Sequence, residues 1–223
     1  MPSKKSAQKA AGNRQAAYTA RNRAALIKAG QEVLAEIGPE ATIEELANHA
    51  QVSPTTIYKY FASKEVLFAE GLNEIYRRWL IWAYNGKPLG GSLETTLDAG
   101  RKLFWVKQSH PLFAKILHNT LRDPTFVISA VKSGAESVFK NYADLGILEK
   151  EDFDKRFVLW SYCYAGILTA VHVTDELSPT QADESLGLAL SIWGISEAKA
   201  KKLISALHED LQSDYSYRIE ELE

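Results

Sequence analysis

Apolar residues recur along most of the chain at spacings of three, four and seven, and alternating strand patterns are scarce. Such spacing places apolar side chains on one face of an amphipathic helix and therefore predicts an all-α fold. The first helix is expected to begin near Thr19 and to stop at Gly38, where Pro39 follows. Residues 1–18, which are poor in large apolar side chains, are expected to form a disordered arm.

Two short helices joined by a tight turn are predicted next. Thr42 and Glu45 form a capping box at the start of one helix, because each side chain can bond the other residue's backbone amide. Ser53 followed by Pro54 is a second start, since proline at the first helical position loses no hydrogen bond. The turn between them, at Gln51 and Val52, is too short for anything but a sharp angle.

A longer helix from Lys64 to about Tyr84, capped by Ser63, completes this region. After a loop rich in Gly and Asn, helical segments are predicted over 93–108, 111–121, 124–142, 152–173, 180–193 and 197–211. Glycine-rich phosphate loops and internal repeats are absent from the sequence.

Charge is distributed unevenly, although its sum is only −2. Residues 1–28 contain seven basic side chains and no acidic one, so the remaining chain is net acidic; the seven are Lys4, Lys5, Lys9, Arg14, Arg21, Arg23 and Lys28. A basic end on an acidic body is typical of proteins that offer one face to a polyanion. A solvated tail is the alternative, and the two are compatible.

The cellular compartment follows from what the chain lacks. Its hydrophobic content of 46% is enough for a buried core, and its single cysteine, Cys163, fits a reducing environment. The first residues carry charge without an apolar signal segment, and the longest apolar stretch, Phe157 to Val173, is short for a membrane span. A cytoplasmic protein with no membrane partner is expected.

The second short helix exposes side chains that suit DNA. Thr55, Thr56 and Lys59 lie on its outer face, with Tyr58 partly so. Hydroxyl groups and lysine can bond phosphates or base edges in the major groove, and a threonine methyl can contact a thymine methyl. Residues 42–64 are therefore interpreted as a helix-turn-helix.

This region resembles the DNA-binding domain of the tetracycline-repressor (TetR) family. The shared pattern comprises Gly38, Thr42, Val52-Ser53, the run from Thr56 to Phe61, Lys64 and Leu67. The chain departs from the family at Gln51, where glycine is usual. The resemblance implies a helix-turn-helix domain over 19–70, with the recognition helix at about 54–60, and a helical ligand-binding and dimerisation domain over 71–223.

The resemblance also implies roles for single residues on double-stranded DNA. Thr42, Thr56 and Lys64 would bind phosphates. Ser53 would cap the recognition helix, and Pro54, Thr55 and Lys59 would face the major groove. Tyr58 and Tyr60 would contact the backbone or base edges. The implied function is that of a ligand-responsive repressor, a homodimer on a palindromic operator, without catalysis or cofactor.

The body, residues 71–223, is rich in aromatic side chains that can fill a core or line an apolar pocket. Candidates for binding a largely apolar effector are Trp82, Phe104, Trp105, His118 and Tyr162. By analogy with the family, the apolar helices over 157–173 and 186–193 would form a four-helix bundle between two subunits, with Gly166 and Ala170 allowing close approach.

Two other functions stay open on the sequence. A helical enzyme or metal-binding protein is the first, because His172, Asp175 and Glu176 have the spacing of one helix face. No second such set, no His-Glu-x-x-His motif and no cysteine cluster accompanies them. The second is a DNA-binding architectural protein that has no ligand.

Overall fold

The computed structural model describes residues 4–204, and the side chains of residues 14–129 and 131–204 within them. These residues form helices and connecting loops without a strand, which confirms the all-α prediction. The chain divides after Gly71 into two compact units, called here the head, residues 1–71, and the body, residues 72–223. The sequence placed this division one residue earlier.

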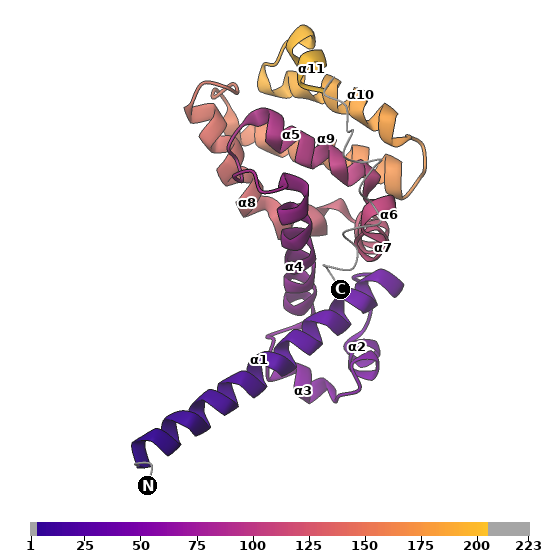
Figure 1. The fold of residues 1–223 in the computed structure, drawn as a ribbon. Helices are drawn as coiled ribbons and strands as arrows, with labels where there is room; N and C mark the ends of the chain where they lie inside the picture. The colour runs from indigo at the N-terminus through magenta and orange to yellow at the C-terminus, as the bar shows by residue number, and fades with distance from the viewer. Residues whose placement is uncertain (1–3, 205–223) are drawn as a thin grey trace. The chain divides into compact units, whose positions relative to one another are not determined.

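The head contains α1 (Lys4–Glu36), α2 (Ile43–His49), α3 (Pro54–Tyr58) and the start of α4 (Lys64–Tyr84) (Figure 1). α1 begins at Lys4, so the prediction of a disordered arm was wrong. The scarcity of large apolar residues in this segment means that the segment has little surface to bury in a core, but it does not prevent the segment from forming a helix. Its alanine, lysine, arginine and glutamine residues all have high intrinsic helix propensity. The side chains of residues 14–21 are exposed along the helix.

The local signals that separate the head's helices are confirmed. Gly38 ends α1 with a φ of 111°, a backbone conformation that favours glycine. Thr42 and Glu45 form the predicted capping box, and Ser53 accepts a hydrogen bond from the amide of Thr56 at 3.2 Å. Gln51 takes the left-handed conformation at a φ of 53°, a region of backbone conformation that glycine enters more readily than other residues do.

The head's core lies where α1, α2, α3 and the first turns of α4 meet. Leu34, Leu46, Ile57 and Leu67 have no measurable exposure, and burial of such side chains contributes roughly 1.5–3 kcal/mol each. At Gly30 an added Cβ would lie 2.2 Å from a methyl carbon of Leu67. A glycine in α1 therefore lets α4 pack closely against it.

The body is built from the remainder of α4 and a further set of helices (Figure 1). In chain order these are α5 (Leu93–Lys102), η1 (Leu103–Trp105), α6 (Val106–Ser109), α7 (Pro111–Thr120), α8 (Pro124–Asp144), α9 (Phe153–His172), α10 (Pro179–Ala189), η2 (Leu190–Trp193) and α11 (Glu197–Ile204). Their bounds agree closely with the predicted segments, although the segments 93–108 and 180–193 each contain a 3-10 turn. Residues 205–211 of the last predicted helix lie outside the described residues.

An aromatic cluster and a buried ion pair hold the body together. Phe139 of α8 packs against Phe157 and Trp160 of α9 and against Trp193, with ring centroids 5.3–6.1 Å apart. Arg101 of α5 donates two hydrogen bonds, of 2.9 and 3.0 Å, to the carboxylate of Asp183 on α10. Both partners are buried. These contacts join elements that are far apart in sequence.

Candidate nucleic-acid interface and ligand cavity

The outer face of α3 carries the side chains that the sequence assigned to DNA. Thr55, Tyr58 and Lys59 are exposed, Tyr58 to 53%, whereas Ile57 on the opposite face is fully buried. α3 ends at Tyr58, two residues before the predicted end. Lys59 and Tyr60 follow in a tightened last turn, in which the Tyr60 amide bonds the Ile57 carbonyl at 2.9 Å. The three exposed side chains provide two hydroxyl groups and one ammonium group for phosphates or base edges.

Tyr60 and the residues that begin α3 have partners within the head. The hydroxyl of Tyr60 accepts a hydrogen bond of 3.1 Å from Asn22 of α1, so its own proton can still be donated. Pro54 is half-buried, and the hydroxyls of Ser53 and Thr56 lie 2.9 Å apart. Ser53 therefore acts as the helix cap here, and a contact to DNA would be an added role.

Thr42 has most of its hydrogen-bonding capacity committed to the capping box. Its hydroxyl donates to the Glu45 carboxylate at 2.8 Å and accepts from the Glu45 amide at 3.2 Å. The hydrogen bond from the Thr42 amide is the main cause that lowers the pKa of Glu45. Because phosphate is an acceptor, it would have to compete with Glu45 for the Thr42 proton.

Lys64 holds the loop between α1 and α2. Its ammonium group donates to the carbonyls of Pro39 and Ala41, at 3.1 and 2.8 Å. An ammonium group has three protons, so two of them are used inside the head. The role implied by the family, phosphate binding, would fall to the third proton, and the structure adds a role in fixing the start of α2.

Basic residues of α1 supply positive charge to the head. Arg21 and Lys28 are exposed. Arg23 is instead paired with Glu70, and its guanidinium lies 4.7 Å above the centre of the Phe61 ring. Arg23 thus stabilises the packing of α1 on α4, and its charge is largely compensated.

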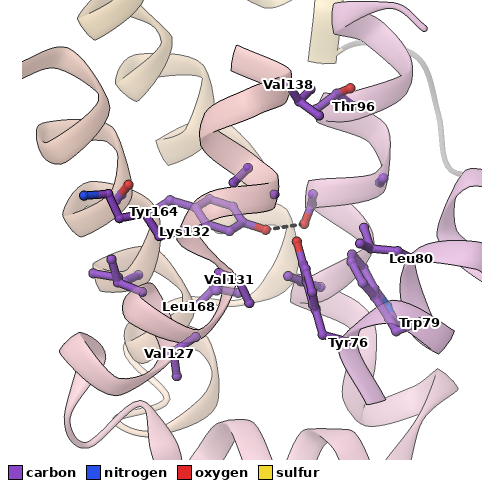
Figure 2. A pocket seen from close by; sticks show the side chains of 18 of the residues that line it. Tyr76, Trp79, Leu80, Thr96, Val127, Val131, Lys132, Val138, Tyr164 and Leu168 are labelled. Atoms are coloured by element: carbon purple, nitrogen blue, oxygen red, sulfur yellow. Dashed lines mark hydrogen bonds between the residues drawn. The ribbon is translucent and has the colours of Figure 1, made fainter. Parts of the chain in front are cut away.

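The body contains an apolar cavity of about 200 Å³, shown in Figure 2. Its wall is formed by α4, α5, α7, α8 and α9, and it is mostly aliphatic and aromatic. Tyr76 and Trp79 of α4, Thr96 of α5, Val131 of α8 and Tyr164 of α9 are among its lining residues. Shape and polarity are those of a site for a small, largely apolar molecule.

None of the five predicted ligand-binding residues is among those that line this cavity. The ring of Trp82 packs 4.8 Å from that of His110, and Tyr162 is 51% exposed on another face of α9. Nδ1 of His118 is hydrogen bonded to the His172 carbonyl at 2.7 Å. Phe104 and Trp105 lie in η1, and the lining residue there is their neighbour Leu103.

The sequence held a signal for the residues that were missed. Leu72, Tyr76, Trp79 and Leu80 recur at the spacing of one helix face, and all of them line the cavity. On α9 the same spacing joins Phe157, Trp160, Tyr164 and Leu168. The prediction selected residues because they were aromatic and not because they shared a helix face, and it therefore named Trp82 and Tyr162, which do not line the cavity.

The three residues whose spacing suggested a metal site, His172, Asp175 and Glu176, do not share one helix face. α9 ends at His172, so Asp175 and Glu176 do not continue its face. His172 is buried with Nε2 bonded to the Leu103 carbonyl at 2.8 Å, whereas Asp175 pairs with Lys107. Within residues 4–204, no three His, Cys, Asp or Glu side chains are grouped so that they could hold a metal ion.

A search for helices able to cross a membrane, limited to the described residues, found none.

An exposed recognition helix in a helix-turn-helix, followed by a helical body with an apolar cavity, defines a transcriptional regulator that binds DNA. Residues 26–70 match the family model of the bacterial regulatory proteins of the tetR family. The match assigns the DNA-binding domain over these residues to the tetR family of bacterial regulatory proteins. A search of curated proteins found no match.

Solved structures share the fold of most of the chain at low sequence identity. RolR in complex with its ligand resorcinol is 16% identical with a TM-score of 0.63, covering 88% of this chain and 99% of that one. A protein from a Rhodococcus species, described as a TetR-family transcriptional regulator, is 20% identical with a TM-score of 0.55, covering 78% and 99%. The fatty acid degradation regulator FadR from Bacillus halodurans is 18% identical with a TM-score of 0.51, covering 76% and 94%.

Proposed function

We propose that this protein is a cytoplasmic, ligand-responsive repressor that acts as a homodimer on a palindromic operator and catalyses no reaction. The observation that carries the proposal is the outer face of α3, where Thr55, Tyr58 and Lys59 are exposed within a TetR-type helix-turn-helix. None of these three side chains is hydrogen bonded or ion paired to another described residue, and DNA offers acceptors for each of them.

Dimerisation is supported by the demands of DNA recognition and by an exposed apolar stripe on α9. A helix as short as α3 reaches few base pairs, and two such helices about 34–36 Å apart would meet successive major grooves. Val158, Leu159 and Tyr162 are 49–61% exposed at helical spacing, and Gly166 continues the stripe with open space around it. Leu188 of α10 is 73% exposed. A second copy of the chain is the partner that such a stripe would have in a four-helix interface.

The dimer can be tested with one substitution on the stripe. Wild type is expected to have twice the mass of the 24.9 kDa chain by light scattering, and Leu159→Glu is expected to have the mass of one chain. Leu145→Glu is the matched control, because Leu145 is equally exposed, at 65% against 61%, but follows α8. A wild-type monomer would contradict the proposal.

The cavity supports a response to a small molecule, and the RolR complex shows that this fold can hold one. α4 contributes Tyr76 and Trp79 to the cavity and begins in the head at Lys64. A ligand that favours one position of α4 would therefore change the affinity of the head for DNA. A compound that raises the melting temperature should weaken operator binding; a stabilising ligand without this effect would remove the regulatory part of the proposal.

Binding to the DNA upstream of the protein's own gene tests the DNA interface. Fluorescence anisotropy at several salt concentrations is expected to show tight, salt-dependent binding by wild type. Lys59→Ala should weaken binding and lower the slope of log affinity against log salt by about 2, one for each subunit of the dimer, and Tyr58→Ala should weaken binding too. Lys115→Ala, the same change at an exposed lysine of the body, should match wild type.

If the upstream DNA is not bound, a genome-wide selection of bound fragments will identify the operator. Fragments bound equally well by wild type, Tyr58→Ala and Lys59→Ala would contradict the assignment of α3 as the recognition helix.

A further inference from the structure

Most polar groups that line the cavity are already hydrogen bonded to the protein. Tyr84 donates to Thr96 at 3.0 Å, and the Thr96 and Tyr142 hydroxyls lie 2.6 Å apart. Tyr142 in turn donates to the Ser92 carbonyl at 2.7 Å. On α9, Ser161 donates to the carbonyl of Phe157 at 2.7 Å. The protons of these hydroxyls are committed, so none of these groups needs a ligand to satisfy it.

Tyr76 is the exception among the hydroxyls of this wall. Its ring stacks on Trp79, with centroids 5.6 Å apart and planes inclined by 21°, but its hydroxyl has no hydrogen bond to any described residue. Figure 2 shows this hydroxyl directed towards the place where Tyr164 donates to the Gly100 carbonyl, a bond of 2.7 Å. The indole N–H of Trp79, whose side chain is almost fully buried, is likewise without an acceptor among the described residues.

The hydroxyls of Tyr76 and Tyr164 share one buried environment. Burial raises the pKa of both, and for Tyr164 the neighbouring Tyr76 raises it further. Both side chains are therefore neutral at physiological pH. Tyr76 can donate one hydrogen bond and accept another, and the oxygen of Tyr164 can still accept one.

Among the described residues, no buried cation is available to balance an anion at this end of the cavity. Arg101 is engaged by Asp183, and the Lys102 ammonium donates to the Ala83 carbonyl at 2.8 Å beside Asp98. Among the residues that line the cavity, the one lysine is Lys132, which is exposed. Burying a carboxylate next to Tyr76 would therefore cost much more than burying a hydroxyl or a carbonyl.

We propose that the cavity binds an uncharged, single-ring-sized apolar molecule whose one buried polar group, a hydroxyl or a carbonyl, is hydrogen bonded by Tyr76. The size follows from the volume, because an apolar cavity of about 150 Å³ is sufficient for benzene and this one measures about 200 Å³. The inference rests on the proposed function, since it names the class of effector that the regulator would recognise.

The test is isothermal titration calorimetry of the full chain with three probes of equal scaffold: 4-ethylphenol, ethylbenzene and 4-ethylbenzoate. Wild type should bind 4-ethylphenol roughly fivefold to tenfold more tightly than ethylbenzene, the range expected of one hydrogen bond in a buried site. It should bind 4-ethylbenzoate more weakly than both.

Two variants locate the preference. In Tyr76→Phe the preference for 4-ethylphenol over ethylbenzene should fall to twofold or less, because the partner hydroxyl is gone. Tyr84→Phe is the matched control: it removes a hydroxyl from the same wall, but one already bonded to Thr96, so the preference should persist.

Three results would overturn the inference: a preference retained in Tyr76→Phe, tightest binding of 4-ethylbenzoate, or no binding of any probe to wild type. Operator binding measured on the same samples separates this from the proposed function. If no probe binds while operator DNA is still bound, the ligand class is wrong and the DNA-binding function stands. If 4-ethylphenol binds through Tyr76 without changing DNA affinity, the ligand class stands and ligand-controlled repression fails.

Discussion

The head and the body of this regulator place their functional side chains in opposite ways. The head exposes Thr55, Tyr58 and Lys59 on a short helix whose ends are set by neighbouring residues. The body encloses Tyr76 and Tyr164, which come from helices almost ninety residues apart in the chain, as the two residue numbers show. A surface that binds DNA can be formed by residues that are close together in the sequence, whereas a cavity forms only after helices that are distant in the sequence have packed together.

The sharpest test of this contrast is the buried ion pair of the body. Arg101→Ala leaves the Asp183 carboxylate buried without its bidentate partner, which is expected to lower the free energy of unfolding by about 3–5 kcal/mol. Urea denaturation followed by circular dichroism measures this. The exposed pair Glu197–Lys201, one turn apart on α11, is the control, and Lys201→Ala should leave stability unchanged. Equal losses in the two variants would contradict the dependence of the body on distant contacts.

Acid should also affect the body through its histidines. Burial lowers the pKa of His110 and of His172 to about 4, below the ordinary value of 6.5. Between those values the unfolded chain binds protons that the folded chain does not. The contribution of these two histidines to the free energy of unfolding is therefore fully present above pH 6.5 and is lost as the pH falls towards 4.

His110→Phe removes one of these two titrating groups, and the fall in melting temperature between pH 7 and pH 5 should become shallower. His49→Phe is the control in the head, because that histidine is exposed and bonded to Glu32. A pH dependence identical in wild type and His110→Phe would show that His110 does not contribute.

In the head, two lysines separate structure from recognition. Lys64→Ala leaves the carbonyls of Pro39 and Ala41 without their donor and is expected to lower the free energy of unfolding by about 1–3 kcal/mol. Lys59→Ala, at an exposed position, should stay within about 0.5 kcal/mol of wild type while weakening DNA binding. Chemical denaturation and anisotropy on the same preparations distinguish the two roles. If Lys64→Ala weakened only DNA binding, its main role would be phosphate contact.

The smallest expected effect is a gain at the turn between α2 and α3. Gln51→Gly relieves a left-handed conformation and should raise the free energy of unfolding by about 1 kcal/mol. Ala50→Gly, one residue earlier at an ordinary φ of −75°, should lower it by about 0.5–1 kcal/mol. Opposite signs at adjacent residues would confirm that the turn geometry decides; two losses would show that Gln51 makes a compensating contact.

The two regions also differ in what the sequence could reveal. The capping box at Thr42, the Ser53-Pro54 start and the left-handed turn at Gln51 were predictable, because each involves residues within a few positions of one another. The roles of Lys64 and Arg23 were not, since their partners Pro39, Ala41 and Glu70 meet them only after α4 packs on α1.

In the body, the helices were predictable and their inner faces were not. Tyr162 and Tyr164 are two residues apart, yet one is 51% exposed and the other lines the cavity. Trp79 and Trp82 likewise divide between the cavity and a contact with His110. Amphipathic spacing limits which side chains of a helix can line the cavity. The packing of neighbouring helices then determines which apolar side chains line the cavity and which contact other side chains.

The cavity around Tyr76 also bears on how long the protein persists. An unfilled space in the core and a hydroxyl without a partner together lower the folding free energy by on the order of a few kcal/mol. A bound molecule restores part of that, so the occupied chain opens less often and is cleaved less often by cellular proteases. The effector would then set the abundance of its own sensor as well as its activity, and depletion of the molecule would be registered twice: at the operator and in the rate at which the chain is turned over.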